Sequence, residues 1–222
     1  MRIKALIFDF DGLILDTETP DVQAWENIYA EYGIPFPVES WGQVIGGTGA
    51  SDFDAAVHLQ SLLSDQLDLA GLKTRQNHIS HSLVEQQQVL PGVIDYVHKA
   101  DRLGLKLAIA SSSHHAWVDT HARRLGIFHY FDHVICADDV GPGRTKPNPD
   151  LFLLALERLR VRKSEAIVFE DSPNGVRAAK SAGIFVVAVP NPVTSLLAIE
   201  NANLTLRSLA DLSLPELLNQ VQ

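Results

Sequence analysis

The chain has 222 residues, of which 46% are hydrophobic and 20% are charged, and its formal net charge at pH 7 is −9. This composition is typical of a folded domain with a sizeable core and argues against wholesale disorder. The acidic balance, with scattered lysines and arginines, argues against a nucleic-acid polymer as partner. The single cysteine, Cys136, excludes an intrachain disulfide and a cysteine-rich zinc site.

The apolar runs of the sequence are all shorter than the ~18 residues that a membrane-spanning helix needs. In the first ten residues, MRIKALIFDF, the apolar run is too short for a signal peptide and is interrupted by an aspartate. From these two observations we expect a cytoplasmic protein that does not act at a membrane.

The first predicted element is a strand over residues 3–9, which are almost continuously apolar. Helical patterns follow at residues 20–33, 51–63 and about 65–88. The second predicted strand begins only at residue 105, and a crossover connection needs far fewer residues than this interval holds. We therefore expect an inserted helical domain over residues 17–86, with a hinge in the polar segment 85–88.

The rest of the chain alternates between helices and strands. Strands are predicted at residues 105–111, 133–137, 166–170 and 184–190, and helices at 91–104, 148–159 and 173–183. In the helix at 148–159 we expect Asn148 at the N-cap and Pro149 in the first helical position. Uninterrupted apolar strands that alternate with helices indicate a parallel sheet buried on both faces. The predicted fold is α/β, with a Rossmann-like core over residues 1–16 and 87–222 and a helical cap over 17–86.

Polar residues that could bind a ligand or take part in a reaction follow these strands. They are Asp9 and Asp11 after the first strand, Ser111 after the second, Lys146 beyond the third, and Glu170 with Asp171 after the fourth. In an open α/β sheet, ligands bind outside the carboxyl ends of the strands, so these residues should meet at one edge. Taken singly, each acid could be a helix cap and the lysine a solvated turn residue.

Four acids at one sheet edge would repel one another and raise one another's pKa values. A divalent cation is the simplest way to keep them ionised, and a site with only oxygen ligands favours Mg²⁺. The remaining polar groups fit an anion: Ser111 and the N–H groups of the next helix could bind a phosphate, and Lys146 could neutralise it. The sequence therefore indicates a phosphate ester as ligand.

The spacing of the first two acids then has a chemical explanation. One aspartate could attack phosphorus and form an aspartyl-phosphate. The second, two residues on, could protonate the leaving oxygen and later deprotonate water. Successive strand residues point to opposite faces, so both acids can meet one phosphorus only if the strand has ended, and Gly12 supplies a flexible exit.

These segments together resemble the motif set of the haloacid dehalogenase superfamily. DFDGLILD (9–16) resembles its first motif, SSS (111–113) its second, Lys146 its third and EDSPNG (170–175) its fourth. The order of the motifs is right, and the resemblance covers essentially the whole chain. A helical insert directly after the first motif is similar to the small cap of the beta-phosphoglucomutase-like branch.

The resemblance implies a role for each matching residue. Asp9 would be the nucleophile and a metal ligand. Asp11 would be the general acid and base, and its main-chain carbonyl would also bind the metal. Ser111, with Ser112 beside it, and Lys146 would bind the phosphoryl group. Asp171 would bind Mg²⁺, with Glu170 acting directly or through water. The expected activity is hydrolysis of a small phosphorylated metabolite, with Asp9, Asp11 and Lys146 as catalytic residues and Asp9, Asp11, Glu170 and Asp171 around the metal.

Two departures bear on the main alternative, a sugar phosphomutase. In that branch a histidine on the first cap helix and an arginine in a cap loop engage the substrate; here Asp21 and Gly49 stand in their places. Both changes favour simple hydrolysis. The presence of Asp11 argues against a true dehalogenase, which lacks that aspartate. A non-catalytic binder of phosphorylated metabolites is a third hypothesis, opposed by the intact Asp9 and Asp11.

Some features leave alternatives open. The segment GGTGASD (46–52) lacks the third glycine of a dinucleotide-binding loop and is expected to be a cap loop near the substrate. His114 and His115 either line the substrate entrance or are solvated. The tryptophans at positions 25, 41 and 117 are expected to serve packing, although Trp25 and Trp41 lie in or beside the cap and could touch a substrate. Sugar phosphates, phosphoglycolate and nucleotide monophosphates all remain possible substrates, and a monomer suits a cap that opens and closes.

Overall fold

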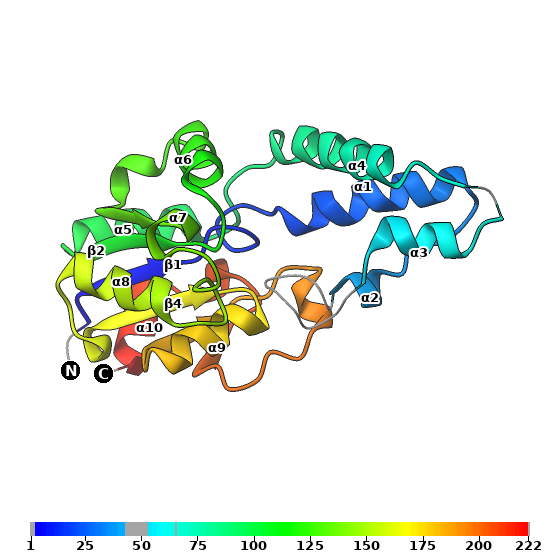
Figure 1. The fold of residues 1–222 in the computed structure, drawn as a ribbon. Helices are drawn as coiled ribbons and strands as arrows, with labels where there is room; N and C mark the ends of the chain where they lie inside the picture. The colour runs from blue at the N-terminus through cyan, green and yellow to red at the C-terminus, as the bar shows by residue number, and fades with distance from the viewer. Residues whose placement is uncertain (1–2, 43–52, 65, 222) are drawn as a thin grey trace.

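The computed structural model describes residues 3–42, 53–64 and 66–221 of the chain. Figure 1 shows a larger lobe built around a sheet and a smaller helical lobe beside it. The strands are β1 (Ala5–Phe8), β2 (Lys106–Ala110), β3 (His133–Ile135), β4 (Ala166–Glu170), β5 (Phe185–Ala188) and β6 (Leu204–Thr205). The helices are α1 (Glu18–Glu31), α2 (Val38–Gly42), α3 (Ala55–Ser61), α4 (Leu69–Val84), α5 (Val93–Arg102), α6 (His115–Arg124), α7 (Ala137–Val140), α8 (Asp150–Leu159), α9 (Pro173–Ser181) and α10 (Leu214–Val221). Short 3-10 helices are η1 (Phe128–Tyr130), η2 (Lys163–Glu165), η3 (Thr194–Leu196) and η4 (Leu209–Asp211).

The six strands form one parallel sheet in the order β3-β2-β1-β4-β5-β6. The strand β1 lies between β2 and β4, and all four of its residues are buried. Leu6 and Phe8 enter the apolar core on one face of the sheet, while Ala5 and Ile7 enter the core on the other. Because alternate side chains of β1 fill two separate cores, every residue of this strand is apolar, as expected for a strand buried on both faces.

Helices cover both faces of the sheet, as expected for an α/β fold. One core contains side chains of α5, α6 and α10, and the other contains side chains of α8 and α9. The predicted Rossmann-like parallel sheet is therefore confirmed. All the strands run the same way, so their carboxyl ends share one edge, and that edge faces the helical lobe in Figure 1.

The helical lobe holds α1 to α4, which fall within the predicted insert 17–86. Its small core is largely aromatic: the Trp25 and Tyr29 rings meet edge to face at 6.3 Å, and Tyr29 meets Phe36 at 5.0 Å. The Tyr29 hydroxyl donates to the Ala55 carbonyl at 2.7 Å, which ties α1 to α3. We call this lobe the cap, and its boundaries at residues 17 and 86 stay a prediction.

The second connection between cap and core contains the predicted hinge at 85–88. Arg124 of α6 donates hydrogen bonds of 3.0 Å to the carbonyl oxygens of Glu85 and Gln87, and one of 3.2 Å to Val84. A core side chain thus holds the end of α4 where it leaves the cap. In the described parts of the chain, no helix has both the length and the apolar character that crossing a membrane would require.

Some predicted elements differ from the structure. The helix expected at 148–159 begins at Asp150, and Pro149 rather than Asn148 is its N-cap residue; the Asn148 amide instead donates to the Gly143 carbonyl at 2.9 Å. The short elements α2 and β6 were not predicted, because five and two residues are too few to show a period. The helix α10 was also missed, although Leu214, Leu217 and Leu218 have helical spacing.

Candidate active site

A cavity of about 540 Å³ lies at the carboxyl edge of the sheet, between the core and the cap. Among the residues that line it are Asp9, Asp11, Ser111, Ser112, Lys146 and Asp171. The structure therefore brings together the residues that the sequence placed at this edge. Glu170 lies behind them, completely buried at the end of β4.

Lys146 connects two of the predicted acids on the core side of the cavity. Its ammonium group donates to Asp9 Oδ1 at 2.5 Å and lies 2.6 Å from Glu170 Oε1. Burial lowers the pKa of Lys146, but the attraction of Asp9 and Glu170 outweighs burial, so the net shift is upward. Lys146 is consequently a permanent positive charge beside Asp9, the predicted nucleophile.

The acids of this cluster outnumber the single lysine. Burial, followed by the charge of Glu170, raises the pKa of Asp9 to about 8, and Lys146 offsets only part of that shift. Burial and the charges of Glu170 and Asp9 also raise the pKa of Asp171 well above its usual range. Burial and mutual repulsion therefore disfavour the ionised form of these carboxyl groups, and a bound cation would stabilise that form.

Asp9, Glu170 and Asp171 have the geometry of a metal site. Each offers a carboxylate oxygen, and these oxygens all lie within 4.8 Å of one another. Glu170 Oε2 is fixed by the backbone N–H groups of Asp171 and Ser172 at 3.1 and 3.2 Å. Its Oε1 is also buried and forms an ion pair with the Lys146 ammonium at 2.6 Å. Three buried carboxylates gathered this closely around one lysine fit a bound cation.

Two glycines allow these acids to approach so closely. A Cβ atom at Gly175, at the start of α9, would overlap the Glu170 carboxylate. A Cβ atom at Gly12 would overlap the Asp171 carboxylate and the Asn191 amide, and Gly12 also has a φ of +78°. The predicted flexible exit at Gly12 is thus confirmed, and close approach is a second reason for glycine there.

The Asp11 carboxylate is held on a different side of the cavity. Ser111 and Ser113 donate to its Oδ2 at 3.1 and 2.7 Å, and the Trp117 indole donates to its Oδ1 at 2.7 Å. This carboxylate is not one of the three that converge on the candidate metal position. Asp11 is thereby kept apart from the metal group and within the same cavity, as a proton-transfer group should be.

A sequence profile of the haloacid dehalogenase-like hydrolase family matches residues 3–183. The chain belongs to this family. The match spans β1, the cap and all four motif segments, which confirms the resemblance drawn from the sequence.

Two relatives within the family are named as phosphatases. The Bacillus subtilis protein "Putative phosphatase YhcW" is 42% identical over 219 residues, which are 99% of this chain and 98% of the relative. The Escherichia coli protein "Fructose-1-phosphate phosphatase YqaB" is 34% identical over 188 residues, 85% of this chain and 97% of the relative. A solved structure from Thermotoga maritima, described as "putative beta-phosphoglucomutase", is 30% identical with a TM-score of 0.75, and the alignment covers 94% of this chain and 96% of that one.

The cap of this haloacid dehalogenase-like hydrolase contributes its own side chains to the cavity. Glu18 and Asp21 of α1 line it, together with Asn77 and His81 of α4. Burial, followed by the charge of Asp21, raises the pKa of Glu18 to about 8. The cap side of the cavity therefore adds two carboxyl groups to the acids of the core side, where Lys146 lies.

Sequence reasoning missed several residues of the site. Trp117 was expected to serve packing, but it donates to Asp11. Asn191 donates to Asp171 Oδ2 at 2.8 Å, although it follows β5 and belongs to none of the four motifs. Its place just beyond a predicted strand was the one available signal. Of the two histidines, His114 lines the cavity and is paired with Asp138, and His115 is paired with Asp119 and Asp139.

Proposed function

We propose that this protein is a Mg²⁺-dependent phosphomonoester hydrolase that acts on a small phosphorylated metabolite through an aspartyl-phosphate at Asp9. The observation that carries the proposal is the arrangement around Asp9: a buried carboxylate paired with Lys146, beside two further acids and across from a tethered Asp11. Such a site can hold a phosphoryl group, attack it and transfer a proton.

The class of reaction is supported by the relatives. Both YhcW and YqaB carry the name phosphatase, and the alignments cover nearly all of each relative. This chain is accordingly a phosphoric monoester hydrolase of the haloacid dehalogenase-like family. The name of YqaB specifies fructose 1-phosphate, which makes sugar monophosphates the first substrates to try.

In the proposed site, Asp9, Glu170 and Asp171 would hold Mg²⁺, and the main chain at Asp11 would complete the set. Bound there, Mg²⁺ would neutralise charge on the phosphoryl group. Asn191 orients Asp171 for this purpose through its 2.8 Å hydrogen bond. The hydroxyl of Ser111, with Ser112 beside it, and the ammonium of Lys146 would bind the phosphoryl oxygens.

The steps then follow from the positions of the two aspartates. Asp9 attacks phosphorus while Asp11 gives its proton to the leaving oxygen, which releases the alcohol. Asp11 next takes a proton from water, and the resulting hydroxide attacks the phosphorus of the aspartyl-phosphate. Inorganic phosphate leaves and Asp9 is regenerated. The cap shields these steps from bulk water.

The mutase alternative is less well supported. Asp21, which stands at the position of the branch's cap histidine, accepts hydrogen bonds from Gln76 and Ser80 and is thus held by other side chains of the cap. Gly49 and the rest of the segment 46–52 lie outside the described residues. The cytoplasmic location and monomeric state expected from the sequence stay predictions.

Release of inorganic phosphate from a panel of small phosphate esters, with Mg²⁺ and with chelator, tests the proposal. Asp9→Asn should abolish turnover while far-UV circular dichroism stays unchanged. Asp95→Asn, on an exposed position of α5, is the matched control and should keep full activity. Activity of Asp9→Asn equal to the wild type would rule out the aspartyl-phosphate, and no release from any ester would rule out the hydrolase.

A further inference from the structure

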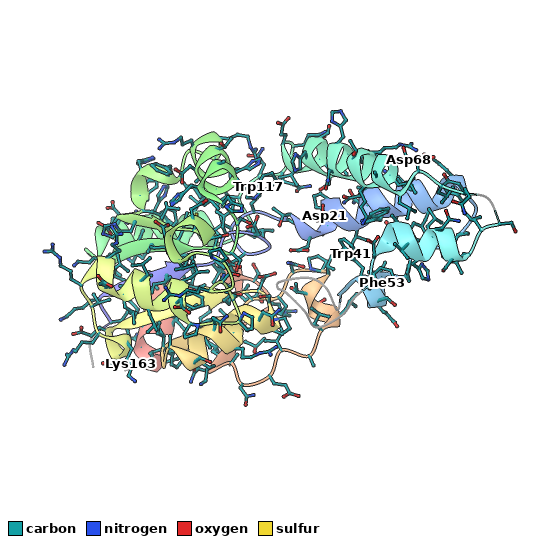
Figure 2. The ribbon with its side chains drawn as sticks, in the orientation of Figure 1. Asp21, Trp41, Phe53, Asp68, Trp117 and Lys163 are labelled. Carbon is teal, nitrogen blue, oxygen red and sulfur yellow. The ribbon has the colours of Figure 1, made fainter. Side chains whose placement is uncertain are left out.

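A second cavity of about 530 Å³ adjoins the candidate active site inside the cap. Glu18, Asp21 and Asn77 line both cavities and therefore stand where the two meet. We call these three side chains the junction residues. Figure 2 labels Asp21 with Trp41 and Phe53, whose rings line the far part of the second cavity. A leaving group attached to a phosphate at Asp9 would extend past the junction residues into this space.

Positive charge on the cap side is scarce. Among the described residues that line the second cavity, Lys73 is the only lysine or arginine, and it forms an ion pair with Asp54. The junction itself carries two carboxyl groups and one amide. Burial, followed by the charge of Asp21, raises the pKa of Glu18, and burial also raises the pKa of Asp21. The junction thus disfavours negative charge, and an added anion at this place would meet the same penalty.

The junction offers hydrogen-bonding groups that suit hydroxyls. Gln76 and Ser80 both donate to Asp21 Oδ1, which fixes this carboxylate, while its Oδ2 accepts from none of the described residues. A hydroxyl can donate to a carboxylate and accept from an amide such as Asn77, whereas a carboxylate or phosphate can only accept.

Aromatic side chains form part of the wall of the second cavity. Trp25, Trp41 and Phe53 line it, and Trp25 is only 3% exposed. Their rings supply apolar surface for the carbon skeleton of a hydroxyl-rich ligand.

From these observations we propose that the junction residues select phosphate monoesters whose leaving group is a neutral polyhydroxylated alcohol, and that they reject bisphosphates and phosphorylated carboxylic acids. This inference rests on the proposed phosphatase function and narrows its substrate class. Phosphoglycolate, which the sequence left open as a substrate, is a phosphorylated carboxylic acid and is therefore excluded by this proposal. Sugar monophosphates and nucleoside monophosphates remain candidate substrates.

Matched pairs of esters test the proposal. Fructose 1-phosphate is compared with fructose 1,6-bisphosphate, and glycerol 3-phosphate with 3-phosphoglycerate, by kcat/KM for phosphate release in Mg²⁺. We expect the neutral member of each pair to be favoured about tenfold or more, since like charges brought together at a binding site are strongly unfavourable. p-Nitrophenyl phosphate serves as the general probe of turnover.

Variants then assign the preference to the junction. Asp21→Asn and Glu18→Gln each replace a buried carboxyl group with a neutral amide that can donate to an anion, and they should lower the preference for the neutral ester several-fold, mainly by improving kcat/KM for the charged one. Glu26→Gln removes one charge from an exposed position of the same helix outside both cavities, and it should leave the preference unchanged. Glu18→Gln remains informative if loss of the Asp21 contacts unfolds the cap.

The outcomes separate the two proposals. Hydrolysis of the charged esters as fast as the neutral ones, or a preference that neither variant alters, overturns the selectivity while the phosphatase function stands. No turnover of any ester, p-nitrophenyl phosphate included, overturns the function and the selectivity together.

Discussion

The indole Nε1–H of Trp117 donates a 2.7 Å hydrogen bond to Asp11 Oδ1, so a residue of α6 holds the proposed general acid. Figure 2 labels Trp117 between the core and the cap. The same ring lies 5.1 Å from the ring of His81, on the cap helix α4. Because an indole N–H can only donate, this contact fixes Asp11 Oδ1 as an acceptor. Trp117 thus links the proton-transfer group to a cap side chain.

Trp117→Phe should therefore impair proton transfer more than phosphoryl binding. The phenyl ring keeps much of the packing but removes the donor to Asp11. We expect kcat for an alkyl phosphate such as glycerol 3-phosphate to fall about tenfold, because its alcohol must be protonated as it leaves. The kcat for p-nitrophenyl phosphate, whose phenolate leaves without help, should fall much less.

Steady-state kinetics on both esters measures this difference. Ser113→Ala removes the donor at 2.7 Å on Asp11 Oδ2 and should act in the same direction. An equal loss with both esters would mean that Trp117 is only a packing residue.

The pH dependence of stability should reveal the acid cluster. In the metal-free protein Asp9 has a raised pKa of about 8, and Asp171 is also shifted upward. Between the ordinary carboxyl pKa of about 4 and that value, the folded state keeps protons that the unfolded state has lost, so stability falls as pH rises through this window. Mg²⁺ should restore most stability where these acids are ionised.

Thermal unfolding in chelator and in Mg²⁺, at pH 5 and pH 8, measures this effect. The increase in Tm caused by Mg²⁺ should be larger at pH 8, and Asp9→Asn should flatten the fall in Tm with pH in chelator. A Mg²⁺ effect as large at pH 5 as at pH 8 would contradict the assignment of these carboxylates as ligands.

Gly12 should tolerate alanine far less well than Gly33 does. Both glycines have left-handed backbones, with φ values of +78° and +70°, so alanine introduces similar backbone strain of about 1–2 kcal/mol at either place. A Cβ atom at Gly33 meets nothing within 4 Å, whereas at Gly12 it would displace Asp171 and Asn191. Gly12→Ala should lose activity and more stability than Gly33→Ala.

Denaturant unfolding and phosphate release on the two variants separate strain from contact. Gly33→Ala should lose a little stability and keep its turnover. Equal losses of stability and turnover in the two variants would show that the close approach of Asp171 and Asn191 to Gly12 does not matter for activity.

Asn191→Ala should weaken Mg²⁺ binding without changing the ligands themselves. Asn191 donates to Asp171 Oδ2 at 2.8 Å and to the Gly12 carbonyl at 3.3 Å, and groups that orient metal ligands are typically worth ~10–100-fold in affinity. The Mg²⁺ concentration for half-maximal activity should rise accordingly, with little change in kcat at saturating Mg²⁺. Asn203→Ala is the control: this residue directly precedes β6, its side chain accepts from the Val186 backbone of β5, and its loss should leave the Mg²⁺ requirement unchanged.

The sequence by itself determined the strands β1 to β5 and the motif residues on the core side of the site. Apolar runs such as ALIF mark buried strands, and acids directly after them must lie at one edge because parallel strands end on the same side. The positions of Asp9, Lys146 and Asp171 around one cavity follow from that rule.

Only the tertiary structure decided which side chains complete the site. Asp11 meets Trp117 because α6 turns that face towards β1, and Asn191 meets Asp171 because the chain returns beyond β5. No local pattern encodes these contacts, since their partners lie 106 and 20 residues apart in the sequence. The acidic junction between the cavities likewise depends on how α1 and α4 pack, because packing, and not periodicity, sets which polar side chains of a helix face a cavity.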